Sequence, residues 1–205
     1  SLLARESGGI NPGAGRVRTR AGGKRLGRAD ADVPGGVLVY AYEEAIGHCV
    51  DPEAVRDKDG ISTAVLACDL VAGLAAQGSS VPAALGALAR RHGLHMTAAV
   101  SRGVATPAEA AAMMARLRAH PPTELAGIAV TAGDRADMLI LSGEDGQASV
   151  RVVVRPSGTE PKVKCYTEVR LPATDDLEGA RVRASALQSR LLAAAPRLKL
   201  LITSR

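Results

Sequence analysis

The sequence contains no tryptophan, no phenylalanine and only three tyrosines among its 205 residues. Proteins that bind single-stranded nucleic acids stack the bases on aromatic side chains, so this composition argues against such a surface. No apolar run reaches the length that crosses a membrane, and the first residues lack a secretory pattern. We therefore expect no nucleic-acid partner and no membrane association.

Cysteine is also scarce, and the three residues Cys49, Cys68 and Cys165 all lie in apolar stretches. Their odd number and their surroundings indicate buried thiols in a reducing compartment. The four histidines are scattered without the spacing of zinc ligands. We therefore expect a cytoplasmic chain that has no metal site of its own.

Positive charge is in excess, and the formal net charge is +5. Such a balance favours anionic partners, either phosphate esters or nucleic acid. Six basic residues accumulate over 16–28. A solvated, charged face accounts for such a run, and no nucleic-acid-binding motif accompanies it. Phosphate esters are therefore the partners that we expect.

The first part of the chain carries a uniformly apolar run, 37–41, that predicts a strand buried on both faces of a parallel sheet. Glu43 and Glu44 follow it, at the end of the strand where open α/β sheets bind ligands. A helix first turn or plain surface charge is the alternative interpretation of this pair. Lys58 precedes a helix expected over 61–77, which is apolar over most of its circumference and hence largely buried. Acidic residues suit the start of a helix, whereas Lys58 does not, which makes it a candidate functional residue.

A second helix is expected over 81–92, ending before Gly93, and the pattern then changes. After it we expect, in chain order, a helix over 107–119, strands over 125–131 and 137–141, two strands on either side of a loop at 155–162, a helix over 175–195 and a frayed tail from residue 197. The first domain, 1–95, is predicted to be a partial α/β domain. The second, 96–205, is predicted to be an α+β domain with a four-stranded antiparallel sheet and two helices.

The loop expected at 155–162 reads Arg-Pro-Ser-Gly-Thr-Glu-Pro-Lys. Runs rich in β-branched residues precede and follow it, and their apolar and polar side chains alternate as they do in strands. Pro156 and Pro161 cannot donate a hydrogen bond to a sheet, so the octet is predicted to join two strands.

The side chains of this loop suit an anion. The guanidinium of Arg155 offers a planar fork that matches a phosphate group bidentately. Ser157 and Thr159 add hydroxyl groups, and Gly158 lets the backbone amides approach an anion closely. A polar loop with proline and glycine is usually only a turn. The combination of these side chains nevertheless favours an anion-binding site.

The octet, with the Val-Lys-Cys-Tyr sequence after it, resembles the C-terminal phosphate-binding loop of the α-D-phosphohexomutases, the phosphoglucomutase and phosphomannomutase family. Three other segments resemble blocks of that family, in the same order: Thr-Arg-Ala-Gly-Gly-Lys at 19–24, Tyr-Ala-Tyr-Glu-Glu-Ala-Ile-Gly at 40–47 and Asp-Lys-Asp-Gly-Ile at 57–61. The resemblance implies most of the three-layer sugar-recognition domain and all of the phosphate-recognition domain, the third and fourth of a four-domain enzyme.

The resemblance also implies which residues would bind the substrate, a hexose phosphate. Lys24 and Lys58 would lie near the transferred phosphoryl group. Glu43 and Glu44 would hydrogen-bond the sugar hydroxyls. The distal phosphate would be held by the loop residues Arg155, Ser157, Gly158 and Thr159.

Two motifs of that family do not occur in this sequence: the loop with the phosphoserine nucleophile and the aspartate-rich loop that holds Mg²⁺. The resemblance therefore implies a C-terminal fragment of an isomerase, an intramolecular phosphotransferase, that is inactive alone. Catalysis would need Mg²⁺, an activator of the glucose 1,6-bisphosphate type and the first and second domains, for which a separate chain is one source. The alternative is a non-catalytic remnant that binds phosphosugars, or one part of a split enzyme.

Overall fold

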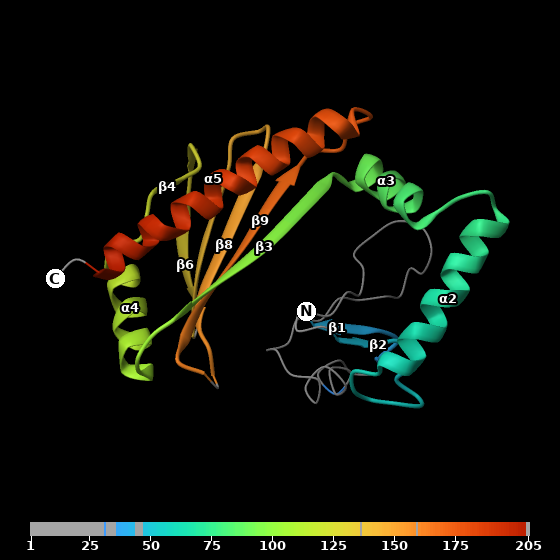
Figure 1. Cartoon of the computed structure of the whole chain (residues 1–205), viewed down its shortest axis with the longest axis horizontal. Helices are drawn as coiled ribbons and strands as arrows, with labels where there is room; N and C mark the ends of the chain where they lie inside the picture. The colour runs from blue at the N-terminus through green and yellow to red at the C-terminus, as the bar shows by residue number, and fades with distance from the viewer. Residues whose placement is uncertain (1–30, 32–35, 44–46, 136, 159, 204–205) are drawn as a thin grey trace. The chain divides into compact units, whose positions relative to one another are not determined.

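The computed structural model describes residues 31, 36–43, 47–135, 137–158 and 160–203 (Figure 1). The chain divides into two compact units between Val81 and Pro82. Lys24, Glu44 and Thr159, which the sequence marks as candidate site residues, lie outside the described residues.

The first unit contains an antiparallel hairpin, β1 (Ala41–Glu43) and β2 (Gly47–Cys49), and the helix α2 (Gly60–Ala76). The prediction of a doubly buried strand in a parallel sheet is wrong. In the apolar run before β1, Val37 and Val39 are 73% and 67% exposed. This run pairs with no strand in the described structure, and apolar side chains alone do not make a strand without a neighbour to complete its hydrogen bonds.

The helix α2 is confirmed, and Asp59 is its N-cap. The carboxylate of Asp59 accepts hydrogen bonds from the amides of Ile61 (3.0 Å) and Ser62 (3.1 Å), donors that the helix itself leaves unpaired. The prediction that this helix is largely buried is wrong. None of its residues is buried, and Ile61 is 80% exposed. Much of its apolar surface is therefore in contact with solvent.

The helix α3 (Val81–His92) has the predicted bounds and leads into the second unit. It ends at Gly93, whose φ is +90° and where an added Cβ would overlap the carbonyl oxygen of Leu171. Only glycine fits both constraints, which confirms the predicted helix end. No single described helix is long and apolar enough to cross a membrane, and α2 and α3 pass that test only when taken as a pair.

The second unit is built on a five-stranded antiparallel sheet in the order β3-β9-β8-β7-β6. Its strands are β3 (Leu94–Gly103), β6 (Thr131–Arg135), β7 (Met138–Glu144), β8 (Ser149–Pro156) and β9 (Lys162–Leu171). The predicted count of four strands is therefore wrong. The additional strand is β3, which pairs with β9 from Leu94 opposite Leu171 to Gly103 opposite Lys162.

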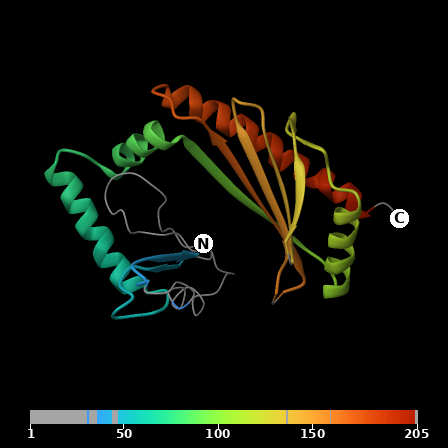
Figure 2. The same ribbon diagram turned by 180° about the vertical axis from the view of Figure 1, so that it is seen from behind.

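Two helices, α4 (Pro107–Ala119) and α5 (Leu177–Thr203), pack on one face of this sheet, as predicted (Figure 1). The core lies between these helices and the sheet. It includes Met113 and Leu117 of α4, Leu141, Val152 and Val169 of the sheet, and Ala184 and Leu191 of α5. Figure 2, the view from behind, shows the sheet in front of α5. No described helix of the second unit covers this second face, which we call the open face.

Two further predictions in this unit are wrong. The strand expected over 125–131 is instead a tight hairpin of β4 (Glu124–Leu125) and β5 (Ile128–Ala129), followed by β6. Ala126 and Gly127 have φ of 54° and 87°, the conformation of a two-residue hairpin turn. The tail expected from residue 197 is helical, because α5 continues to Thr203.

Candidate functional site

The loop between β8 and β9, which the sequence predicts to bind an anion, is closed by backbone hydrogen bonds. The amide of Ser157 donates to the carbonyl of Lys162 (2.8 Å), whose own amide donates to the carbonyl of Glu160 (2.8 Å). The amide of Val104 donates to the carbonyl of Pro161 (2.9 Å), which ties the loop to the segment after β3. The octet therefore joins two strands as predicted, and a third segment also holds it.

An ion pair lies within the same loop. Lys162 Nζ is 2.5 Å from a carboxylate oxygen of Glu160. The hydrogen bond from Lys162, together with the positive charges of Lys162 and Lys164, lowers the pKa of the Glu160 carboxyl group. The carboxylate nearest to Arg155 in the sequence of the loop is thus already paired with a lysine.

Arg155 projects from the end of β8 on the open face, because the alternate residues Val152 and Val154 face the core. It lies opposite Lys164 of β9, and its guanidinium carbon is 5.8 Å from the ring centre of Tyr166. This distance is within the range of cation–π attraction. No carboxylate bonds to Arg155 among the residues that the structure describes. The Arg155 guanidinium therefore lies over the Tyr166 ring, and its N–H donors remain available to an oxyanion.

Ser157 and Gly158 form the bend that follows β8. The amide of Ser157 is used to close the loop, so its hydroxyl is the group that remains for an anion. Gly158 is exposed, and a Cβ added to it would meet nothing within 4 Å. Open space therefore lies over the Gly158 backbone, as an anion cradle requires.

In the first unit, Lys58 packs against Gly47 of the hairpin. Glu43 pairs with Gly47 across the hairpin, and the Cγ and Cδ atoms of Lys58 occupy the position that a side chain on Gly47 would take. The amide of Asp59 donates to the carbonyl of His48 (3.0 Å), which fixes the segment that carries Lys58. Lys58 thus lies against Gly47, the residue that pairs with Glu43 in the hairpin.

Two tyrosines hold His48 on the same hairpin. The hydroxyl of Tyr40 is 2.8 Å from Nδ1 of His48, and the rings of Tyr42 and His48 have centroids 4.7 Å apart. Burial, with a smaller contribution from Tyr42, raises the pKa of Tyr40, so its hydroxyl stays protonated at neutral pH. His48 therefore has a structural role: its contacts with Tyr40 and Tyr42 hold the hairpin together.

Lys164 is a neighbour of Arg155 that sequence reasoning did not single out. It lies opposite Arg155 on β9 and adds a second positive charge to that part of the open face. The alternation of side chains along β9 places Lys164 and Tyr166 on one face, but the register with β8 decides that Arg155 is their neighbour.

The described residues hold no group of three His, Cys, Asp or Glu side chains that could bind a metal ion. A Mg²⁺ ion needs several oxygen ligands arranged around one point. This part of the chain therefore does not fit the ion, and we assign it no part in binding one.

Comparison with known proteins finds relatives of this chain. Residues 104–185 match the family described as "Phosphoglucomutase/phosphomannomutase, C-terminal domain". A probable phosphomannomutase from Haemophilus influenzae is 37% identical over 140 residues, which cover 65% of this chain and 28% of that protein. A phosphoglucomutase from Staphylococcus aureus is 29% identical over 160 residues, which cover 68% of this chain and 29% of that protein. The chain thus spans less than a third of the length of these curated relatives.

Proposed function

The chain belongs to the phosphoglucomutase and phosphomannomutase family, and on this premise we propose that it binds the sugar and the distal phosphate of a hexose phosphate during an intramolecular phosphoryl transfer. One observation carries the proposal: Arg155 bonds to no described carboxylate, and open space lies over Gly158 in the same loop. A guanidinium fork beside an unhindered backbone suits a phosphate monoester.

The role proposed for the loop is to orient the substrate. Phosphoryl transfer depends chiefly on positioning and on stabilisation of charge. Arg155 would donate to two oxygens of the phosphate that does not react. The hydroxyls of Ser157 and Thr159 and the backbone of Gly158 would complete the cradle. A phosphate held in this way directs the other end of the sugar towards the reacting centre.

The role proposed for the first unit is to recognise the sugar. Glu43 and Glu44 would accept hydrogen bonds from sugar hydroxyls, and Lys58 and Lys24 would lie near the transferred phosphoryl group. The contact of Lys58 with Gly47, the residue that pairs with Glu43, supports a common role for Lys58 and Glu43.

We further propose that another polypeptide, a separate chain, supplies the nucleophile and the Mg²⁺ site, and that this chain alone has no turnover. The exposed apolar surface of α2 supports a partner surface for this unit, because such a surface favours burial. An activator of the glucose 1,6-bisphosphate type would be required, as in the family. A cytoplasmic location is supported by the free thiols of Cys49, Cys68 and Cys165.

Titration calorimetry with glucose 1,6-bisphosphate tests the binding proposal. Arg155→Ala should weaken binding by about tenfold to a hundredfold, because a charge-assisted hydrogen bond contributes about 1.5–3 kcal/mol. Arg183→Ala, which removes an exposed arginine of α5, is the matched control and should bind as the wild type does. Equal affinity of Arg155→Ala and the wild type would overturn the proposal.

Turnover is a separate question with its own assay. The chain supplied with Mg²⁺ and the bisphosphate should not isomerise glucose 1-phosphate. Isomerisation by the chain alone would show that no second polypeptide is needed, and it would leave the binding proposal intact.

A further inference from the structure

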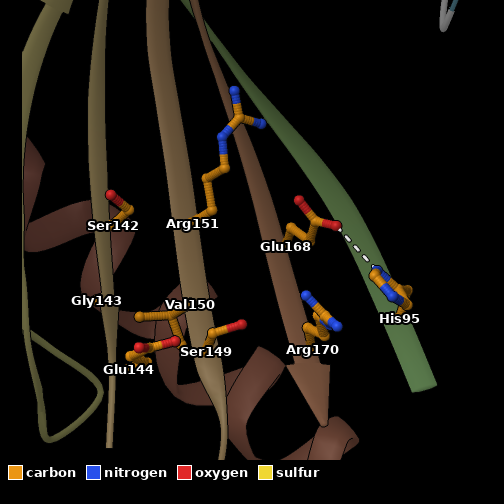
Figure 3. A pocket seen from close by; sticks show the side chains of 9 residues that line it. All are labelled: His95, Ser142, Gly143, Glu144, Ser149, Val150, Arg151, Glu168 and Arg170. Carbon is orange, nitrogen blue, oxygen red and sulfur yellow. Dashed lines mark hydrogen bonds and ion pairs between the residues drawn. The ribbon is translucent and has the colours of Figure 1, made fainter. Parts of the chain in front are cut away.

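The open face carries a polar depression at the end of the strands away from the loop. The strand registers place two adjacent rows of side chains there (Figure 3). One row crosses the sheet through Ser142, Arg151 and Glu168, and the next crosses it through Glu144, Ser149, Arg170 and His95. None of these residues belongs to the loop between β8 and β9.

The depression has a volume of about 420 Å³, which is within the size range of sites for small ligands. Arg151 and Arg170 line it from neighbouring strands, together with the hydroxyl-bearing residues Ser142 and Ser149. A pair of guanidinium groups and hydroxyl groups on one concave surface is a set of hydrogen-bond donors suited to an oxyanion.

The two arginines have no acidic partner in the described residues. The side chains of Arg151 and Arg170 make no hydrogen bond or ion pair there. Glu168, which lies opposite Arg151, has its carboxylate 3.1 Å from Nδ1 of His95 on β3. Arg151 and Arg170 are diagonal neighbours, so their Cβ atoms are about 7–8 Å apart.

We propose that this depression is a second oxyanion site, which binds the phosphoryl group of a small phosphate ester or free phosphate. Arg151 and Arg170 donate to its oxygens, and the hydroxyl of Ser149, which lies opposite Arg170 on β8, donates as well. The carboxylate of Glu144 lies in the same row and can accept a hydrogen bond from a ligand hydroxyl, which favours the phosphate ester of a polyol.

This site is separate from the loop. Ser149 and Arg155 are six positions apart on β8, which corresponds to about 20 Å along an extended strand. A single phosphoryl group cannot contact both places. The inference rests on the open face alone and does not depend on the function proposed for the loop.

Amide ¹H–¹⁵N NMR spectra of the full chain, titrated with inorganic phosphate or with glycerol 3-phosphate, test the proposal. Millimolar ligand should shift the amide signals of Ser149, Arg151 and Arg170 as a group separate from Gly158. The double variant Arg151→Gln, Arg170→Gln should weaken binding at the first group by about tenfold or more, because it removes the charge-assisted donors. In this double variant the ligand should still shift the amide signal of Gly158. That result also shows that the variant is folded.

Two controls separate the possible outcomes. Arg155→Ala should leave the shifts at Arg151 and Arg170 unchanged, so a failure of the loop is distinguishable from a failure of this site. Arg181→Gln with Arg183→Gln removes the same charge from α5 and should change neither group. Shifts that need glycerol phosphate identify an ester site, and shifts with both ligands identify a phosphate site. No shift at Arg151 and Arg170 with either ligand, or shifts that persist in the double variant, would overturn the proposal.

Discussion

The side chain of Lys58 lies directly on the backbone of Gly47, where a Cβ would overlap its Cγ and Cδ atoms. Gly47 pairs with Glu43 across the hairpin, so the lysine stem reaches the end of β1 only because position 47 has no side chain. Any side chain at position 47 would therefore have to displace the lysine stem.

We expect Gly47→Ala to displace Lys58 and to weaken binding of glucose 1,6-bisphosphate by about tenfold, as Lys58→Ala should, because both remove one charge-assisted contact. Titration calorimetry measures the effect. Gly73→Ala in α2, where an added Cβ meets nothing within 4 Å, is the control. Full affinity in Gly47→Ala, together with weak binding in Lys58→Ala, would contradict the prediction.

We expect Gly158→Ala to separate stability from binding. The added methyl group meets no described atom, and φ at this position is outside the left-handed region, so the melting temperature should be unchanged or slightly higher. The same methyl group enters the space proposed for the phosphate, and affinity should fall by about tenfold. Gly103→Ala, at an equally open position, should change neither quantity. Unchanged affinity in Gly158→Ala would argue that the anion does not approach this backbone.

A buried polar pair should dominate the response of the second unit to substitution. Gln188 of α5 donates to the hydroxyl of Thr167 (2.5 Å), which donates to the carbonyl of Ala98 (3.2 Å). Thr167→Val leaves the buried Gln188 amide without its acceptor, and we expect a loss of about 1–3 kcal/mol in the free energy of unfolding.

Urea denaturation measures this loss, and a double variant checks its cause. Thr167→Val combined with Gln188→Leu removes both polar partners, so most of the lost stability should return. A double variant that is less stable than Thr167→Val would show that packing, and not the unpaired amide, sets the cost.

We expect the stabilisation contributed by Glu160 to depend on pH. Lys162 lowers the pKa of this carboxyl group in the folded chain below its value in the unfolded chain, about 4.3. The stabilisation is therefore fully present above the unfolded pKa and is lost as the pH falls through the folded pKa. Glu160→Gln should melt at a slightly lower temperature than the wild type near neutral pH and at the same temperature in strong acid.

Melting curves across that pH range measure the difference. Because Glu160 is exposed, the effect should be small and should shrink as salt is added. Glu124→Gln, which alters an exposed carboxylate of β4, is the control. A difference between wild type and Glu160→Gln that grows towards acid pH would have the wrong sign for this ion pair.

Local chemistry made several elements predictable. The bounds of α4 follow from Pro107 in its first turn and from Thr106, whose hydroxyl accepts a bond from the amide of Glu109 (3.2 Å). Pro156 and Pro161 mark the ends of the loop between β8 and β9. In each case, residues close together in sequence determine the structure.

Pairing between distant segments was not predictable. The strand β3 is not among the predicted strands, because its partner β9 lies far along the chain and neither sequence encodes the register by itself. For the same reason, the sequence identified Arg155 but not its neighbour Lys164. The exposure of α2 could not be predicted either, since an apolar helix indicates that a partner surface exists but not where that surface lies.

The hydrogen bond from Val104 to Pro161 has a mechanical consequence. The loop is fastened to the edge strand of the sheet as well as to the two central strands that it connects. A small shift of β3 along its own axis would therefore displace Pro161 and change the conformation of the loop, even if β8 and Arg155 did not move. The position of the edge strand and the shape of the loop are in this way linked.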